Sequence, residues 1–207
     1  MNIRNENLTD ANEVETLIRE AFWNLYVMGC DEHLSAHQIR KHPDFIPQLT
    51  FVLEDNNQII GSITCTNAKI IDKNNAEHPV ISFGPVCIHP DFHRQGLGRK
   101  LITHFIKEAK KLDYSAIITL GFEHHYSPYG FKGGQEFNIS YNNSFTGLLV
   151  LPLFDGALEG ISGNVHFTEA LEVTPTDLEK FDALFPYKKK VITQSQLDFQ
   201  KFLSENL

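Results

Sequence analysis

The chain has 207 residues, of which 42% are apolar and 21% are charged, and its formal net charge is −8. This length and composition predict one globular α/β domain, alone or with an appendage, and the acidic balance argues against a nucleic-acid partner, charged transfer RNA included. Residues 2–10 are polar and charged, and even the longest apolar runs, such as residues 147–151, are too short to cross a bilayer. We therefore expect no secretory signal and no membrane insertion, and a cytoplasmic protein.

Two helices are predicted in the first quarter of the chain. Asp10 and Glu13 have the spacing of a capping box at the start of the first helix. Its apolar positions recur at helical intervals: Val14, Leu17, Ile18, Ala21 and Phe22. A second helix is predicted over residues 32–41 and ends before Pro43.

Strands follow. Residues 49–54 and 58–67 read as two strands joined by a turn at Asp55-Asn56-Asn57, and residues 68–71 extend the second strand or begin a bend. The β-rich run 80–88 is broken by Gly84-Pro85, which predicts a bulge or splay in that strand.

One βαβ unit occupies the middle of the chain. A long amphipathic helix is predicted over residues 98–112, with the apolar stripe Leu97, Leu101, Phe105, Ala109 and Leu112. Residues 116–120 form a short apolar run typical of a buried strand. Strand, glycine-rich loop, helix and strand therefore follow one another in order.

Further strands are predicted at residues 147–153 and 164–168, and short helices begin near Thr174 and Thr193. We expect residues 1–170 to form the main domain, with residues 171–207 as a helical extension packed on it.

Cysteine and histidine spacing favours no disulfide framework and no metal site. Cys30, Cys65 and Cys87 are odd in number and lack CxxC spacing, as is typical of reduced thiols. His33 and His37 share one face of a predicted helix, but neither an HExxH motif nor a cysteine pair accompanies them.

The loop before the long helix is the main candidate for ligand binding. Backbone N–H groups at a helix N-terminus attract anions, and Gly96 and Gly98 allow close approach to them. Arg94 and Arg99 add positive charge, although a glycine pair of this kind also suits a plain turn. The loop does not match a P-loop, because the pattern G-x-x-x-x-G-K-[ST] does not occur in it. It does not match a Rossmann loop either, because Leu101 stands where the third glycine of G-x-G-x-x-G would fall.

Residues 86–101, VCIHPDFHRQGLGRKL, resemble the central cofactor motif of the GNAT N-acetyltransferases, a strand followed by [RQ]-x-x-G-x-[GA]. His93 stands at the first position of this motif, where the family has Arg or Gln. Residues 125–131, HYSPYGF, resemble the family's Y-x-x-x-G-F. The Gly84-Pro85-Val86 segment is similar to a subgroup of uncharacterised bacterial acetyltransferases. The resemblance extends loosely over residues 3–170, and residues 171–207 match nothing in the shared core.

This resemblance implies an α/β (α+β) fold, a mixed and mostly antiparallel sheet flanked by helices, with a V-shaped opening between residues 86–88 and 116–120. It also implies acetyl-CoA as co-substrate, bound by Val86, Cys87, Ile88, His93, Arg94, Gln95, Gly96, Leu97, Gly98 and Arg99. The Ile88 backbone N–H is the candidate to polarise the thioester carbonyl, and Tyr126 is the candidate general acid. Tyr126 also suits the role of an aromatic filler with a satisfied hydroxyl.

The general base stays open among six residues: Asp31, Glu32, His33, Glu123, His124 and His125. Cys87 is interpreted as a small residue of a buried strand rather than as a nucleophile. The Lys188-Lys189-Lys190 run suits a solvated face, or a docking site for an acidic partner.

The implied function is N-acetyltransferase, moving an acetyl group from acetyl-CoA to a primary amine of a small molecule or peptide by direct attack in a ternary complex. The alternative is a non-catalytic acyl-CoA sensor or partner-recruiting module. We expect no metal, no nucleic acid and no membrane as partner. A homodimer, and an acyl donor longer than acetyl, stay open.

Overall fold

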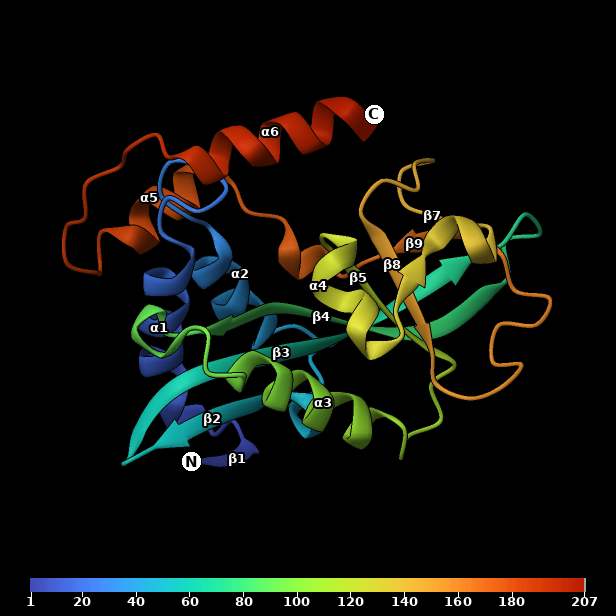
Figure 1. The fold of residues 1–207 in the computed structure, drawn as a ribbon, viewed down its shortest axis with the longest axis horizontal. Helices are drawn as coiled ribbons and strands as arrows, with labels where there is room; N and C mark the ends of the chain where they lie inside the picture. The colour runs from blue at the N-terminus through green and yellow to red at the C-terminus, as the bar shows by residue number, and fades with distance from the viewer. Residues whose placement is uncertain (207) are drawn as a thin grey trace.

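A computed structural model of the protein describes residues 1–206. Within them, nine strands form one sheet in the order β1-β2-β3-β4-β5-β8-β6, with β7 paired to β9 and β9 paired to β3 (Figure 1). Neighbours are antiparallel except in the β4–β5 and β7–β9 pairs, so the predicted mixed, mostly antiparallel sheet is confirmed. The strands are β1 Asn2–Asn5, β2 Phe51–Asp55, β3 Gln58–Ile71, β4 Glu77–Ile88, β5 Ala116–Leu120, β6 Lys132–Gly133, β7 Ile139–Ser140, β8 Leu148–Pro152 and β9 Gly163–His166.

Helices cover both faces of this sheet. They are α1 Ala11–Phe22, α2 Glu32–Ile39, α3 Leu97–Ala109, α4 Glu123–Tyr126, α5 Pro175–Asp182 and α6 Gln194–Asn206. Short 3₁₀ helices lie at Leu8–Asp10, Pro47–Leu49, Pro90–Phe92, Ser127–Tyr129, Gly134–Phe137 and Glu169–Leu171. The apolar side of α3 packs into the main core with Phe51, Phe83 and Ile117, whereas α1 and α2 pack on the other face with Val52, Ile59 and Cys87.

Helix α1 forms where the sequence predicts, but the predicted capping box is wrong. Val14, Leu17 and Ile18 are buried, as their spacing requires. The Asp10 carboxylate accepts hydrogen bonds from Arg4 at 2.6 and 3.1 Å and from the Asn7 N–H at 2.7 Å. Glu13 accepts the N–H of Ile59 at 2.7 Å instead of closing the box. Both carboxylates therefore bind partners outside α1 and do not cap its N-terminus.

The β2–β3 hairpin follows the sequence closely. Asn56 and Asn57 have φ values of 49° and 63°, a left-handed conformation that asparagine adopts more readily than most residues. Strand β3 continues to Ile71, so residues 68–71 extend it rather than bend. One edge of β3 pairs with β2 near its start and with β9 at its end.

Helix α3 is shorter than predicted. Its apolar stripe is buried through Ala109, but the helix ends there and Leu112 is 39% exposed. Three lysines at 107, 110 and 111 surround the end, where cations are favourable beside unpaired carbonyl groups. Helical spacing at Leu112 is therefore not evidence of another buried turn.

The C-terminal segment packs against the end of α1. Thr174 caps α5 by accepting the N–H of Asp177, as the sequence predicts. The Gln196 amide on α6 donates to the carbonyls of Asn24 and Val27, at 3.0 Å each. No helix found between residues 1 and 206 has both the length and the apolar character needed to cross a lipid bilayer.

Candidate functional site

Strands β4 and β5 separate after a short shared ladder. Their pairing is limited to Ile81 with Ile117 and Ser82 with Ile118. Thr119 Oγ1 then donates to the Phe83 carbonyl at 3.3 Å. Pro85 has no N–H with which to continue the ladder. The two strands therefore part beyond Gly84, as the Gly-Pro break predicts.

The register of β4 sets the direction of its free backbone groups. His89 N–H donates to the Ile60 carbonyl at 2.8 Å, and Cys87 lies opposite Ser62. Residues alternate in an antiparallel ladder, so Cys87 and His89 direct their N–H groups toward β3. Val86 and Ile88 direct theirs the other way, to the side where β5 has separated.

The loop that follows β4 is held by a histidine. His93 Nε2 donates to the Ile88 carbonyl at 2.9 Å. The side chain that departs from the family motif therefore ties the loop to the end of the strand. The ring is exposed, so this bond borders the opening.

The N-terminus of α3 leaves backbone donors free. Arg94 and Gly96 have φ values of 60° and 75°, and α3 begins at Leu97. The N–H groups of residues 97–99 have no acceptor inside a helix that starts there. They have none elsewhere among residues 1–206. A Cβ on Gly96 would meet no atom within 4 Å, so the space over the loop is open.

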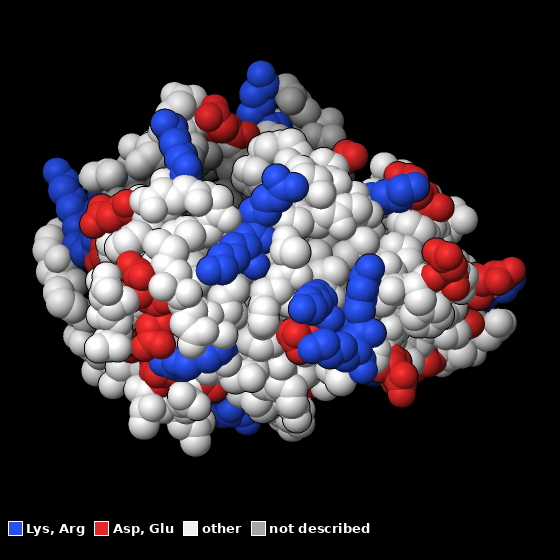
Figure 2. Space-filling model, turned by 60° about the horizontal axis from the view of Figure 1, so that its bottom comes forward, with Lys and Arg blue, Asp and Glu red and all other residues white. Residues whose placement is uncertain are grey.

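Positive charge gathers around this loop and along α3. Residues 94–111 carry six exposed bases and a single carboxylate, that of Glu108, in a chain of net charge −8. The bases are Arg94, Arg99, Lys100, Lys107, Lys110 and Lys111. Figure 2 shows basic side chains across the middle of the face that α3 occupies at the bottom of Figure 1. Phosphate groups would find a locally favourable field here.

Tyr126 ends α4, just beyond the end of β5. Its ring packs against Phe83 and Phe131, with centroids 5.6 and 5.7 Å away. Burial raises the pKa of Tyr126 to about 12, with smaller contributions from Tyr26 and Tyr129. No hydrogen bond of its hydroxyl occurs within residues 1–206. The ring therefore packs as a filler aromatic does, while its hydroxyl has no hydrogen-bond partner among the described residues.

Gly121 makes room for the Tyr126 ring, although no sequence motif singles out this glycine. A Cβ at this position would lie 2.7 Å from Tyr126 Cε2. Any larger residue would displace the ring from the end of β5.

The six candidate bases differ sharply in environment. Asp31, Glu123, His124 and His125 are exposed. His33 is fully buried between Phe181 and Phe185, and burial lowers its pKa to about 4. Glu32 is half-buried, and burial raises its pKa to about 7. Its carboxylate thus titrates near neutral pH.

Helix α6 contributes aromatic side chains that pack on Tyr26 and Phe122, a contact that sequence spacing could not predict. Phe199 lies 4.9 Å from the Tyr26 ring and 6.2 Å from the Phe122 ring, measured between centroids. Phe202 lies 4.6 Å from Phe122. Figure 1 shows α6 crossing the top of the molecule, from above α1 and α2 toward α4. The extension therefore bridges the loop after α1 and the end of β5.

The lysine run contributes to packing at the end of α1. The Lys189 carbonyl accepts from the side chains of Trp23 and Asn24, both at 3.1 Å. Lys188 pairs with Glu20. A surface hollow of about 570 Å³ lies beside this run and also involves Arg19, Asp182 and Phe185. This hollow belongs to the extension rather than to the opening beside β4.

Known proteins are similar to this chain in sequence. The sequence pattern of the Acetyltransferase (GNAT) family matches residues 16–127. The uncharacterized N-acetyltransferase YhbS of Escherichia coli K12 is 25% identical over 171 residues, which cover 82% of this chain and 97% of YhbS.

Solved structures share the fold. A crystal structure of E. coli YhbS in complex with CoA has a TM-score of 0.72 at 23% identity, covering 82% of this chain and 90% of that one. A GNAT family acetyltransferase from Brucella melitensis, in complex with acetyl-CoA, has a TM-score of 0.68 at 22% identity, covering 83% and 97%. The chain described here belongs to the GNAT acetyltransferase family.

Proposed function

We propose that this protein transfers an acetyl group from acetyl-CoA to a primary amine, by direct attack within a ternary complex. The observation that carries the proposal is the row of unpaired N–H groups at residues 97–99, beside a strand whose outward N–H groups are also free. The crystallised relatives with CoA and acetyl-CoA support it.

The coenzyme would lie along the opening. Its pyrophosphate would accept hydrogen bonds from the N–H groups of residues 95–99, with Arg94 and Arg99 supplying charge. The pantetheine arm would run beside Val86 and Ile88, which turn backbone groups toward the space that β5 leaves. The thioester carbonyl would then reach the Ile88 N–H, a fixed donor for the charge that develops on oxygen.

Tyr126 would protonate the departing thiolate. Its pKa of about 12 keeps the phenol protonated throughout neutral pH, so the donor is always in the required state. Packing against Phe83 and Phe131 fixes the ring at the end of β5. A positioned acid of this kind contributes roughly 100-fold to the rate or more.

We assign these roles to residues 1–170, with residues 171–207 as an extension that borders the acceptor side through Phe199. The acceptor would be an amine of a small molecule or peptide, and the setting would be the cytoplasm.

The test is release of CoA thiol from acetyl-CoA across a panel of amines, with binding of CoA measured by calorimetry. Tyr126→Phe should lower kcat about 100-fold while CoA affinity stays at the wild-type value. Equal kcat in the wild type and in Tyr126→Phe would show that Tyr126 does not protonate the leaving thiolate. CoA binding with no turnover of any amine would identify a sensor instead, and absence of CoA binding would overturn the whole proposal.

A further inference from the structure

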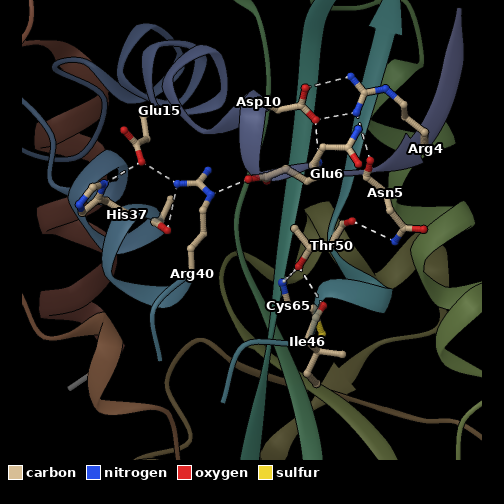
Figure 3. Close-up of polar contacts among 12 residues, drawn as sticks. Arg4, Asn5, Glu6, Asp10, Glu15, His37, Arg40, Ile46, Thr50 and Cys65 are labelled. Atoms are coloured by element: carbon tan, nitrogen blue, oxygen red, sulfur yellow. Dashed lines mark hydrogen bonds and ion pairs between the residues drawn. The ribbon is translucent and has the colours of Figure 1, made fainter. Parts of the chain in front are cut away.

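Arg40 shows how a buried arginine of this chain is normally compensated. Its guanidinium donates to Glu6 through Nε and to Glu15 through Nη1, the latter at 2.7 Å (Figure 3). Nη1 also donates to the Ala36 carbonyl at 3.2 Å. Two carboxylates and a carbonyl group therefore share one guanidinium, as is usual for a charge removed from water.

Arg19 on α1 is more deeply buried than Arg40 but has fewer partners. Its side chain is 3% exposed, and its Nε donates to Asp182 at 2.7 Å. Its guanidinium also stacks over Trp23 and Phe185, at 4.3 and 5.4 Å from the ring centroids. Within residues 1–206, Nη1 and Nη2 of Arg19 form no hydrogen bond. A fork of two N–H donor groups is therefore left without an acceptor.

Arg19 lines the surface hollow of about 570 Å³ beside the lysine run. Its Nη atoms are not among the unpartnered polar atoms that are fully enclosed, unlike Nη2 of Arg40, so a ligand in the hollow can reach them. The side chains of Phe185 and Tyr187 line the same hollow. Its volume is in the range of sites that hold small organic molecules. The hollow thus combines a buried pair of donors with aromatic surface.

The charge around this hollow is positive. The lysine run lines it together with Arg19, and Asp182 supplies the single carboxylate among the lining residues of the described chain. Asp182 pairs with Arg19, and Lys188 pairs with Glu20. The other two lysines of the run form no ion pair within residues 1–206. Two positive charges of the lining are therefore uncompensated.

Asn24 fixes the backbone of the lysine run. Its Nδ2 donates to the Lys189 carbonyl at 3.1 Å, and its Oδ1 accepts the Val191 N–H at 3.2 Å. A Cβ on Gly29 would lie 3.0 Å from Lys190 Cε, so the stem of Lys190 lies against the chain at this glycine. Figure 1 shows the segment between α5 and α6, which carries the run, at the upper left. The lysines are thus held beside the hollow, which a merely solvated face does not require.

We propose that this hollow binds a phosphate monoester with an aromatic body. Nη1 and Nη2 of Arg19 would donate to two phosphate oxygens, because a guanidinium fork matches their spacing. Lys189 and Lys190 would balance the charge of the dianion, and the rings of Phe185 and Tyr187 would pack against the aromatic group. The site stands apart from the opening beside β4, so it does not depend on acetyl transfer.

Such a ligand would join three segments of the chain. Arg19 belongs to α1, Phe185 follows α5, and the lysine run precedes α6. A ligand that binds only the folded state stabilises it by mass action. The midpoint of thermal unfolding should therefore rise as phenyl phosphate is added.

Calorimetry with phenyl phosphate on the full chain tests the site. Phenyl phosphate should bind, and its affinity should fall as salt is added, because the lysines are exposed. Inorganic phosphate should bind more weakly, because it offers no ring to Phe185 and Tyr187. Phenol, which has no phosphate group, should not bind. Absence of phenyl phosphate binding would overturn the inference, and equal affinity for inorganic phosphate would overturn the assigned ligand class.

Variants of the exposed lysines locate the bound phosphate. Lys189→Gln and Lys190→Gln should each weaken phenyl phosphate binding by about tenfold, because each removes one charge-assisted hydrogen bond. Arg99→Gln is the matched control, because it removes an exposed base beside the loop before α3. Its affinity for phenyl phosphate should equal that of the wild type. Lost affinity in Arg99→Gln with wild-type affinity in both lysine variants would place the phosphate at that loop and overturn the inference.

Arg19→Lys tests the fork separately from its charge. This variant keeps a cation beside Asp182 but cannot donate to two oxygens from one plane. It should weaken phenyl phosphate binding at least as much as the lysine variants do, with circular dichroism confirming that the protein is folded. Wild-type affinity in folded Arg19→Lys would show that the guanidinium does not bind the phosphate, and would overturn the inference.

Discussion

Arg19 donates from Nε to Asp182 Oδ1 at 2.7 Å and thereby joins α1 to α5 across most of the sequence. The Arg19 side chain is 3% exposed, and its guanidinium lies 4.3 Å from the centroid of the Trp23 ring. His33 Nε2 lies 3.3 Å from the same Asp182 oxygen, without the alignment of a hydrogen bond. One carboxylate therefore compensates the charge of a buried arginine and fastens the C-terminal extension.

Asp182→Ala should destabilise the protein by about 3 kcal/mol, because the change leaves the Arg19 charge buried without its partner. Urea denaturation followed by circular dichroism measures this loss. Glu77→Ala is the matched control, because its pair with Lys69 is exposed and should contribute at most about 1 kcal/mol. Equal losses in the two variants would show that the Arg19–Asp182 pair is no more important than a surface pair.

Gly96 and Gly98 should respond differently to alanine. Gly96 has a φ of 75°, in which a Cβ costs about 1–2 kcal/mol. Gly96→Ala should therefore let the free loop leave this conformation, which CoA binding must then restore, and weaken CoA binding by about tenfold in calorimetry, since about 1.4 kcal/mol corresponds to that factor. A Cβ on Gly98 would lie 3.7 Å from Ile88 Cγ1, an ordinary contact, so Gly98→Ala should bind CoA nearly as the wild type does. The reverse order would refute the assigned loop geometry.

His93→Ala should also weaken CoA binding, because it removes the 2.9 Å bond that ties the loop to the Ile88 carbonyl. His93→Gln should restore most of the affinity, since a side-chain amide also donates a hydrogen bond. Calorimetry with CoA compares the three proteins. If alanine and glutamine weaken binding equally, the bond to Ile88 has no part in shaping the loop.

Cys87→Ala should retain the wild-type kcat. Burial raises the pKa of the Cys87 thiol to about 12, so the group is protonated at neutral pH and is a poor nucleophile. Its Sγ lies 3.4 Å from Ser62 Oγ, and losing this contact should cost about 1 kcal/mol of stability. Mass spectrometry after incubation with acetyl-CoA provides an independent check. An acetyl group on Cys87 would contradict direct transfer to the amine.

Local sequence predicted the central unit well. Gly96 next to the apolar stripe of α3 places a helix start after a strand, because turn chemistry and helical periodicity act over a few residues. The Gly84-Pro85 break likewise predicts where β4 leaves β5. Errors occurred where partners outside the helix bind the capping side chains: Arg4 binds Asp10 from 6 residues away, and Ile59 binds Glu13 from 46 residues away.

The sequence by itself determined the glycine loop before α3, the order of the elements around it and the position of the tyrosine that follows β5. Only the tertiary structure decided which of the six candidate bases are buried, and which aromatic residues pack on Tyr26. The reason is physical: burial and charge compensation depend on groups brought together from far along the chain. Tyr26 meets Phe199, and Arg19 meets Asp182, at separations that no local pattern encodes.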